Sequence, residues 1–399
     1  MTAEIYLFNP ENDMALANFT PYYKVSSEIM RMKHGLEMLP AWFAPSGSRV
    51  RVGEVPEAAE YAACLAEWGI RLPVGWTGEW EDAPYVPWGW NPALLHTLRT
   101  AGVPEHRLLT DGQMRLLREL SGRETGRKVL YRLKPLEGVC GESWVCRSSE
   151  EVCSHLDRLG QVMLKAPWSG SGRGVMKAGP SDWNASLQGW VQRIIRTQGG
   201  IMVEPLYQKS CDFAMEFYAD GKGHVNFAGY SLFDTDEHGN YKGNFLLPDA
   251  EIVRSLTSWV SPHTLDTVRE ALLAELSALL GTAYRGYLGV DMMICRIGEN
   301  WQVHPCVEIN LRMNMGVVSR LFFDRWMDPL VRGKFVVEHY FADGEALEAH
   351  HRFLESCPLS IRDNRMTGGY LSLTPVARET RYQIYVQVSA PASPETAEG

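Results

Sequence analysis

Residues 162–179, VMLKAPWSGSGRGVMKAG, place an apolar run that ends in Lys165 before a glycine- and serine-rich loop, and a second apolar run follows. Both runs alternate with period two, which predicts a strand, a loop and a second strand. Because glycine has no Cβ, the backbone N–H groups of such a loop can approach phosphate oxygens closely. The adjacent lysine adds a positive charge that can pair with phosphate. The stretch predicts either a phosphate-binding hairpin or an ordinary surface hairpin with a solvated lysine.

The order of elements disfavours other phosphate-binding designs. A Walker loop has the pattern GxxxxGK[ST] and leads into a helix, and the sequence has no such match. A dinucleotide-binding fingerprint also opens a helix, whereas GVMKAG alternates like a strand. Protein kinases use a similar hairpin, but their lysine follows it and HRD and DFG motifs come later; this sequence has neither.

A second pattern lies near residue 300, where GYLGVDMMICR and HPCVEINLR read as two strands of a hairpin. If the connecting turn holds an even number of residues, Asp291 faces Cys306 across the hairpin. Side chains on a strand alternate between the two faces, so Asp291, Glu308 and Asn310 then project from one face. An odd turn or a bulge would break this arrangement.

The side chains of this face suit a metal ion that is bound to phosphates. Two carboxylates and one amide oxygen form the hard-oxygen set that Mg²⁺ prefers, with substrate phosphates and waters completing its shell. Arg312 continues the alternation and can hold a phosphoryl or carboxylate group through two parallel hydrogen bonds. The alternative is the solvated outer face of an antiparallel sheet.

The order VMLKAPWSGSGRGV, IMVEPLY…DFAMEFY and GYLGVDMMI…VEINLR resembles the ATP-grasp superfamily, in which two α+β lobes hold Mg-ATP between them. The resemblance covers roughly residues 106–330, and the preceding residues match the α/β domain of that family in kind only. The implied fold class is α/β and α+β, with a small α/β domain before the two lobes. The expected divisions are an α/β domain at 1–105, a lobe with a glycine-rich lid at 106–200, a lobe with the metal site at 201–345, and an extension at 346–399 whose tail, APASPETAEG, is mobile.

The resemblance also implies roles for individual residues. Lys165 and the glycine-rich lid would contact the phosphates, the hinge after Glu204 would lie beside the adenine, and Asp212 would bind the ribose, where the family more often has Glu. The implied nucleotide-binding residues are Lys165, Gly170, Ser171, Gly172, Gly174, Glu204, Pro205, Leu206, Asp212 and Lys242. The implied ligands of Mg²⁺, or of Mn²⁺ in its place, are Asp291, Glu308 and Asn310, and Arg312 would steady the transferred phosphate.

One departure from the family concerns the first phosphate contact. The family commonly places an early lysine after an SDK-like signal, whereas the run TDGQMRLL has Gln113 and Arg115 where that lysine is looked for. Lys128 and Lys134, in the run KVLYRLKPL that we interpret as a strand, are alternative sources of the charge. The sequence leaves the choice between them open.

The reaction that the resemblance implies is an ATP-dependent ligation in which Lys165 and Arg312 are catalytic. A substrate carboxylate would be activated as an acyl phosphate and then attacked by an amine or a thiol. The alternatives are a nucleotide-gated binding or regulatory protein without ligation and a phosphotransferase to a non-carboxylate acceptor. The partners would be a small-molecule carboxylate and an amine, and the polar loop NPENDMALANFTPYYK is either a recognition segment or an ordinary turn, with candidate residues Asn9, Asn12, Asp13, Tyr22, Tyr23 and Lys24.

Composition excludes several other classes of protein. Of the 399 residues, 45% are hydrophobic and 22% charged, which is typical of a globular protein. A formal charge of −9 argues against nucleic-acid binding. The N-terminus lacks the basic segment of a signal peptide and no apolar run is long enough to span a membrane, so we expect no membrane contact and a cytoplasmic location. The eight scattered cysteines predict reduced thiols, and the oligomeric state, a homo-oligomer included, stays open.

Overall fold

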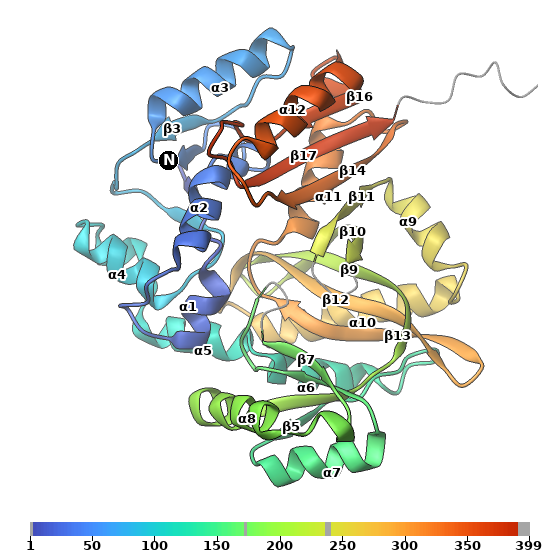
Figure 1. Cartoon of the computed structure of the whole chain (residues 1–399). Helices are drawn as coiled ribbons and strands as arrows, with labels where there is room; N and C mark the ends of the chain where they lie inside the picture. Colours follow the sequence, from blue (N-terminus) through green and yellow to red (C-terminus); the bar gives the residue numbers. More distant parts are fainter. Residues whose placement is uncertain (1–2, 171–173, 236–240, 390–399) are drawn as a thin grey trace, which may run out of the picture.

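The computed structural model describes residues 3–170, 174–235 and 241–389, and within these ranges the strands form three sheets (Figure 1). Ser171 and Gly172 of the predicted lid and the tail at 390–399 lie outside the described residues. Among the described helices, none combines the length and apolar character needed to cross a membrane. The predicted fold class, α/β followed by α+β, is confirmed.

The N-terminal layer is built on a parallel four-stranded sheet with the order β3-β2-β1-β4. The buried run after residue 4 forms the central strand β1, and its neighbours β2 and β4 lie on opposite sides. The strand order therefore reverses at β1, and such a switch point is where open α/β sheets commonly bind ligands. The elements are β1 (Ile5–Leu7), α1 (Asn12–Asn18), α2 (Ser27–Leu36), η1 (Leu39–Trp42), β2 (Arg49–Arg51), α3 (Val55–Glu67), β3 (Gly75–Thr77), β4 (Tyr85–Pro87), α4 (Pro92–Thr100) and η2 (Glu105–Arg107).

Two segments differ from the sequence prediction because short apolar runs do not separate helix from strand or loop. Part of the predicted polar loop forms helix α1, since Ala15 and Leu16 bury one side of it. The predicted strand KVLYRLKPL lies largely in helix α6 (Arg123–Leu133), which follows α5 (Asp111–Leu120). Its buried residues Val129, Leu130 and Leu133 have the spacing of a single helical face.

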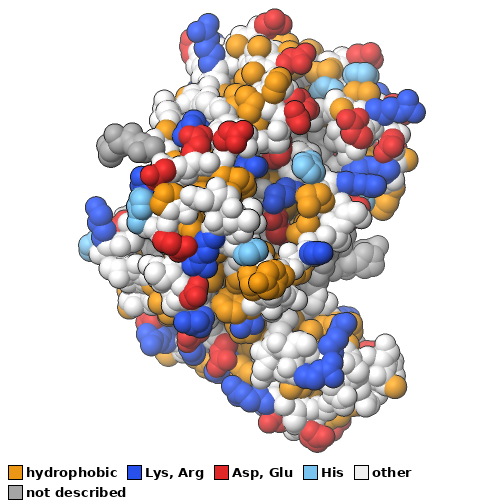
Figure 2. Space-filling view, turned by 90° about the vertical axis from the view of Figure 1, so that its left-hand side faces the viewer, with side chains coloured by type: hydrophobic (Ala, Val, Ile, Leu, Met, Phe, Trp, Pro, Cys, Tyr) orange, Lys and Arg blue, Asp and Glu red, His pale blue; other side chains and the backbone are white. Residues whose placement is uncertain are grey.

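The lid lobe, residues 144–205, contains an antiparallel sheet with the order β5-β8-β6-β7. Its helices pack on one face, where Val162, Leu164 and Val203 are fully buried. Figure 2 shows this lobe projecting from the lower part of the molecule. Its elements are β5 (Trp144–Cys146), α7 (Ser149–Leu159), β6 (Val162–Lys165), β7 (Val175–Ala178), η3 (Pro180–Asp182), α8 (Ala185–Gln198) and β8 (Ile201–Pro205).

The central sheet has nine strands in the order β13-β12-β9-β10-β11-β14-β17-β16-β15. One face of its first strands is apolar and packs against α10, with Phe213, Met215 and Val290 buried there. Residues 332–389 continue the same sheet through β14. The elements are β9 (Gln208–Asp220), β10 (Val225–Thr235), β11 (Tyr241–Leu246), α9 (Asp249–Leu256), α10 (Pro262–Leu280), β12 (Arg285–Ile297), β13 (Asn300–Asn310), α11 (Met315–Trp326), β14 (Arg332–His339), α12 (Glu345–Ser356), β15 (Ser360–Arg362), β16 (Arg365–Ser372) and β17 (Tyr382–Ser389).

The C-terminal part of the chain also packs against the N-terminal layer. The indole Nε1 of Trp42 donates to the carbonyl of Leu373 at 2.6 Å, and Trp326 Nε1 donates to the carbonyl of Trp42 at 2.7 Å. All three residues belong to one hydrophobic cluster. The beginning and the end of the described chain thus share a core.

Candidate functional site

A buried ion pair lies on the face of the lid-lobe sheet that the helices of the lobe do not cover. Lys165 ends β6 and Glu204 lies in β8, and alternation places both on the sheet face opposite the apolar core of the lobe. Lys165 Nζ lies 2.5 Å from Glu204 Oε2, and Ser143 Oγ donates to Glu204 Oε1 at 3.1 Å. Both charged side chains are less than a tenth exposed. The charge of Lys165 is therefore compensated within the protein by Glu204.

The remaining predicted lid and hinge residues that the structure describes lie after β6 and at the end of β8. The carbonyl of Gly174, at a φ of 77°, accepts from the N–H of Ala166 at 2.8 Å and closes the hairpin after β6. Gly170 lies in the described part of the same loop. Pro205 ends β8, and Leu206 follows it with an exposed side chain.

The opposing metal-ligand candidates meet across the hairpin of β12 and β13. Its turn is even, with Ile297 opposite Asn300, which meets the condition that the sequence left open. A bulge then lets three residues of β13 face Met292 alone, so Asp291 lies opposite Glu308 and not opposite Cys306. The displaced residues include a proline, which has no N–H for the ladder. Because the register shifts by two residues, both carboxylates still lie on one face.

Burial shapes the electrostatics of these carboxylates. Asn310 Nδ2 donates to Asp291 Oδ2 at 3.0 Å. Burial raises the pKa of Asp291 to about 7, and the charge of Glu308 adds to the shift. A divalent cation would remove that repulsion, and two carboxylates with an amide oxygen are a donor set that fits Mg²⁺. We therefore find Asp291, Glu308 and Asn310 suited to hold it.

Arg123 is a site residue that the sequence prediction missed. It begins α6, and its side chain is 6% exposed. Its guanidinium donates to Glu308 Oε2 at 2.8 Å, to the Ala166 carbonyl at 2.6 Å and to Ser169 Oγ at 2.7 Å. Arg123 thus joins the beginning of the lid loop to the metal-ligand candidates. The signal in the sequence was the run Ser-Gly-Arg at 121–123, a small-residue break followed by a basic residue at the start of a helix.

The structure places the earlier candidates for that charge elsewhere. Gln113 caps α5 by accepting from the N–H of Thr110 at 2.8 Å, and Arg115 is exposed. Lys128 is also exposed, and Lys134 pairs with Glu142 at 2.7 Å.

Arg312 is bound by a residue of the N-terminal layer. Its guanidinium donates to both carboxylate oxygens of Asp13, at 2.7 and 2.6 Å, and to Asn310 Oδ1 at 3.1 Å. The pairing closes a pocket with 20 Å³ of space, lined by Asn12, Asp13, Leu16, Ser121, Pro167, Trp168, Ser169, Glu308, Ile309, Asn310, Leu311 and Arg312. That space holds about one water molecule.

The last two candidates lie farther along the sheet. Asp212 pairs with Lys209 and accepts from Thr235 Oγ1 at 3.2 Å, on the face that carries Asp291. Lys242 is exposed on β11, next to residues outside the described ranges. The charge of Asp212 nevertheless acts on the site, because it contributes to the raised pKa of Asp291.

A buried thiol shows that the two lobes converge. Burial raises the pKa of Cys306, and the carboxylates of Glu204, Asp291 and Glu308 raise it further while Lys165 lowers it. Groups from the lid lobe and from the central sheet therefore act on one sulfur atom. The hydrogen bonds of one guanidinium show the same proximity, because Arg123 donates to the carbonyl of Ala166, next to Lys165, and to Glu308 on β13.

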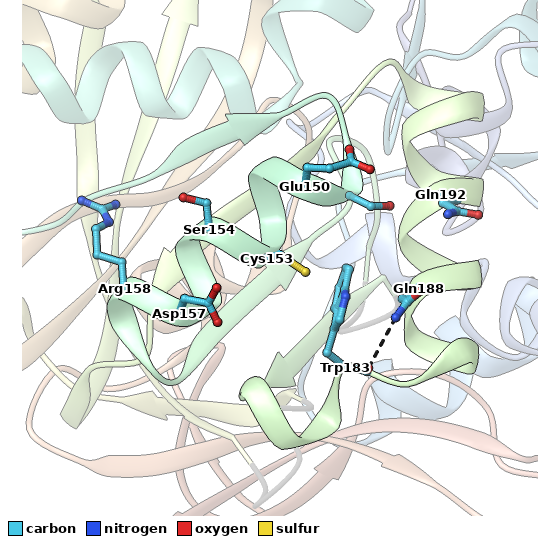
Figure 3. A pocket seen from close by; sticks show the side chains of 9 residues that line it. Glu150, Cys153, Ser154, Asp157, Arg158, Trp183, Gln188 and Gln192 are labelled. Carbon is cyan, nitrogen blue, oxygen red and sulfur yellow. Dashed lines mark hydrogen bonds between the residues drawn. The ribbon is translucent and has the colours of Figure 1, made fainter.

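A larger hollow lies away from this chemistry. Figure 3 shows a pocket of 710 Å³ between α7 and α8, with Trp183 at its side. It is open on the outer face of the lid lobe, opposite the face that carries Lys165 and Glu204. Its size does not make it the reactive site, because the paired carboxylates and the buried lysine lie elsewhere.

Comparisons with known proteins match the fold and not the sequence. No protein-family model and no curated protein matches the chain. A biotin carboxylase from Campylobacter jejuni, solved as a β,γ-ATP complex, aligns at 13% identity with a TM-score of 0.50 over 98% of this chain and 88% of that one. A pyruvate carboxylase from Rhizobium etli aligns at 13% identity and a TM-score of 0.50 over 98% of this chain and 36% of that one. A carboxyaminoimidazole ribonucleotide synthase from Aspergillus clavatus, complexed with ATP, has 12% identity and a TM-score of 0.48 over 88% and 95%.

Proposed function

From its ATP-grasp fold, we propose that the chain is an ATP- and Mg²⁺-dependent ligase that activates a substrate carboxylate as an acyl phosphate for attack by an amine or a thiol. The observation that carries the proposal is the guanidinium of Arg123, which donates to the Ala166 carbonyl and to Ser169 Oγ just after Lys165 and also to Glu308 Oε2 on the central sheet. Positive charge on one lobe and metal-ligand candidates on the other suit a nucleotide triphosphate between them.

Each group has a role in binding or in the transfer. Lys165 and Arg123 would pair with phosphate oxygens, and Asp291, Glu308 and Asn310 would hold a divalent metal, which would supply positive charge to the phosphates. A carboxylate oxygen of the substrate attacks the γ-phosphorus as the bond to the β-phosphate oxygen breaks and ADP leaves. Arg312 steadies the acyl phosphate, and attack by the amine or thiol on its carbonyl carbon releases phosphate.

The lid protects the intermediate. Arg123 donates to Ala166 and Ser169 at the start of the loop and to Glu308 on the central sheet. Closure of the loop is therefore linked to the metal-ligand set. A closed loop excludes water, which would otherwise hydrolyse the acyl phosphate.

Nucleotide binding is tested by thermal unfolding with ATP or ADP, with and without Mg²⁺. A ligand that binds only the folded state stabilises it by about 2.7 kcal/mol at a hundredfold excess over Kd. We expect a magnesium-dependent rise in Tm for the wild type that is reduced in Glu308→Gln. Glu251→Gln, which alters an ion pair with Arg332 outside the site, is the matched control and should keep the shift. No shift with either nucleotide at millimolar concentration would contradict the proposal.

Ligation is then separated from the other reactions of a nucleotide site. ADP release that depends on adding both an acid and an amine or thiol supports the ligase. ADP release with an alcohol acceptor alone would indicate a phosphotransferase. Binding without ADP release under any of these conditions would indicate a nucleotide-gated binding protein.

A further inference from the structure

The pair formed by Asp13 and Arg312 has the geometry of a bound carboxylate. Two parallel hydrogen bonds of 2.7 and 2.6 Å join the guanidinium to the two carboxylate oxygens. The side chains are 22% and 16% exposed, so water compensates neither charge fully. Asp13 therefore occupies the position on Arg312 that the proposed function gives to an acid or acyl phosphate.

Asp13 also stands where three parts of the molecule meet. It belongs to α1, which begins just after β1, the strand at which the order of the N-terminal sheet reverses. A Cβ at Gly170 would lie 2.4 Å from Asp13 Oδ2, so the start of the lid loop rests directly on this carboxylate. The space beside the pair is 20 Å³, so in this conformation a substrate carboxylate that binds Nε and Nη2 of Arg312 takes the place of Asp13.

The displacement of Asp13 from Arg312 determines which class of substrate fits the site. Separating a largely buried ion pair leaves two charges that each need a partner. A simple acid would satisfy Arg312 and leave Asp13 unpaired, and a simple amine would do the reverse. A molecule that carries both a carboxylate and an ammonium group satisfies both residues at once.

We propose that the acid substrate is an amino-acid-like zwitterion whose carboxylate binds Arg312 and whose ammonium group binds Asp13. This inference rests on the proposed function. The carboxylate oxygen forms the new bond to the γ-phosphorus, and ADP leaves. The ammonium group stays protonated because the Asp13 carboxylate accepts its hydrogen bonds, so the nucleophile of the second step is a separate amine or thiol.

The test measures binding by calorimetry to protein saturated with MgADP. The twenty amino acids are screened first, and each binder is compared with its deaminated acid and its decarboxylated amine; for alanine these are propionate and ethylamine. We expect the zwitterion to bind at least about tenfold more tightly than either fragment, as for a buried pair with both charges compensated. Asp13→Asn should remove the preference for the zwitterion over its deaminated acid, because the partner of the ammonium group is lost while competition for Arg312 falls equally for both ligands.

The matched control is Asp249→Asn, which removes a carboxylate from another largely buried arginine, Arg320, at 3.1 Å. It should leave the order of affinities unchanged. The inference is overturned if the deaminated acid binds the wild type as tightly as the zwitterion, if Asp13→Asn keeps the full preference, or if no amino acid binds protein that binds MgADP. Failure of MgADP itself to bind would instead contradict the proposed function and, with it, this inference.

Discussion

His304 is a buried histidine whose two ring nitrogens have no hydrogen-bond partner among the described residues. It faces Met293 across the hairpin, beside the site. Burial lowers its pKa to about 4, against an ordinary value of 6.5, so the folded protein holds it neutral where the unfolded chain would be protonated. His304 is therefore unprotonated in the folded protein near neutral pH.

This predicts a pH dependence of stability. Above pH 6.5 the residue is neutral in both states and contributes no change. As pH falls from about 6.5 to about 4, the unfolded state gains the proton first, and stability falls by roughly 3 kcal/mol from this group. His304→Phe should therefore lose less stability than the wild type between pH 7 and pH 5 in urea unfolding. His96→Gln, at an exposed position, should behave like the wild type; equal losses in all three proteins would contradict the account.

At the scale of single residues, alternation and spacing predicted which side chains share a face. Asp291 and Glu308 lie on one face although the bulge changed their partners, because a shift of two residues preserves alternation. Their roles, like those of Lys165 and Arg312, stay predictions. Arg123 was missed because its run starts a helix that was interpreted as a strand. Asp13 was placed in a candidate loop, but its partner lies 299 residues away, and no local pattern encodes that contact.

At the scale of elements, helix α11 lies so close to the central sheet that a side chain at position 316 would not fit between them. A Cβ at Gly316 would lie 2.1 Å from Glu216 Oε1 and 2.7 Å from Ser231 Oγ. Glu216 is fully buried, accepts from Asn314 Nδ2 at 3.1 Å, and has its pKa raised to about 8 by burial. The carboxyl group cannot move aside into solvent.

Gly316→Ala should therefore destabilise the protein by about 1–3 kcal/mol, the range for overpacking a core. The matched control is Gly189→Ala in α8, where an added Cβ meets nothing within 4 Å. That change should stabilise by about 0.5–1 kcal/mol, because alanine loses less backbone entropy in a helix than glycine. Tm values of both variants check the pair, and a neutral Gly316→Ala would show that α11 can shift.

Elements were predicted best where the pattern is long and local chemistry marks its ends. Helix α10 begins after the cap Ser261, and over 19 residues it buries Leu265, Val268, Leu272 and Leu276 at helical spacing. Helices α1 and α6 are short and mix charges with apolar residues, so periodicity alone did not identify them. The bulge of β13 depends on pairing with a neighbouring strand, which the sequence of one strand does not reveal.

At the scale of the whole molecule, the order of motifs along the chain predicted the ATP-grasp fold, and that prediction is confirmed. Composition did not reveal that residues 332–389 would extend the central sheet. Strand β14 pairs with β11 on one side and β17 on the other. This pairing depends on the complete fold. The sequence shows the alternation within each strand and does not show which strands pair.

Removing the end of the chain should therefore damage both ends. A chain that stops at residue 345 loses α12 and β15–β17, which uncovers the edge of β14 and leaves the Trp42 indole without its acceptor. We expect this protein to aggregate on expression, because an open strand edge and an exposed core face favour association. A chain that stops at residue 389 keeps every contact described above and should stay in the soluble fraction. Soluble, cooperatively melting 1–345 protein would contradict this.

The contact between Trp42 and Leu373 has a consequence for biosynthesis. The two residues are 331 positions apart, so ribosomes that add about 5–20 residues per second need roughly 15–65 s to produce the second after the first. During that interval the nascent N-terminal layer presents an uncovered core surface to chaperones and proteases. The amount of active protein in a cell then depends on translation speed as well as on thermodynamics.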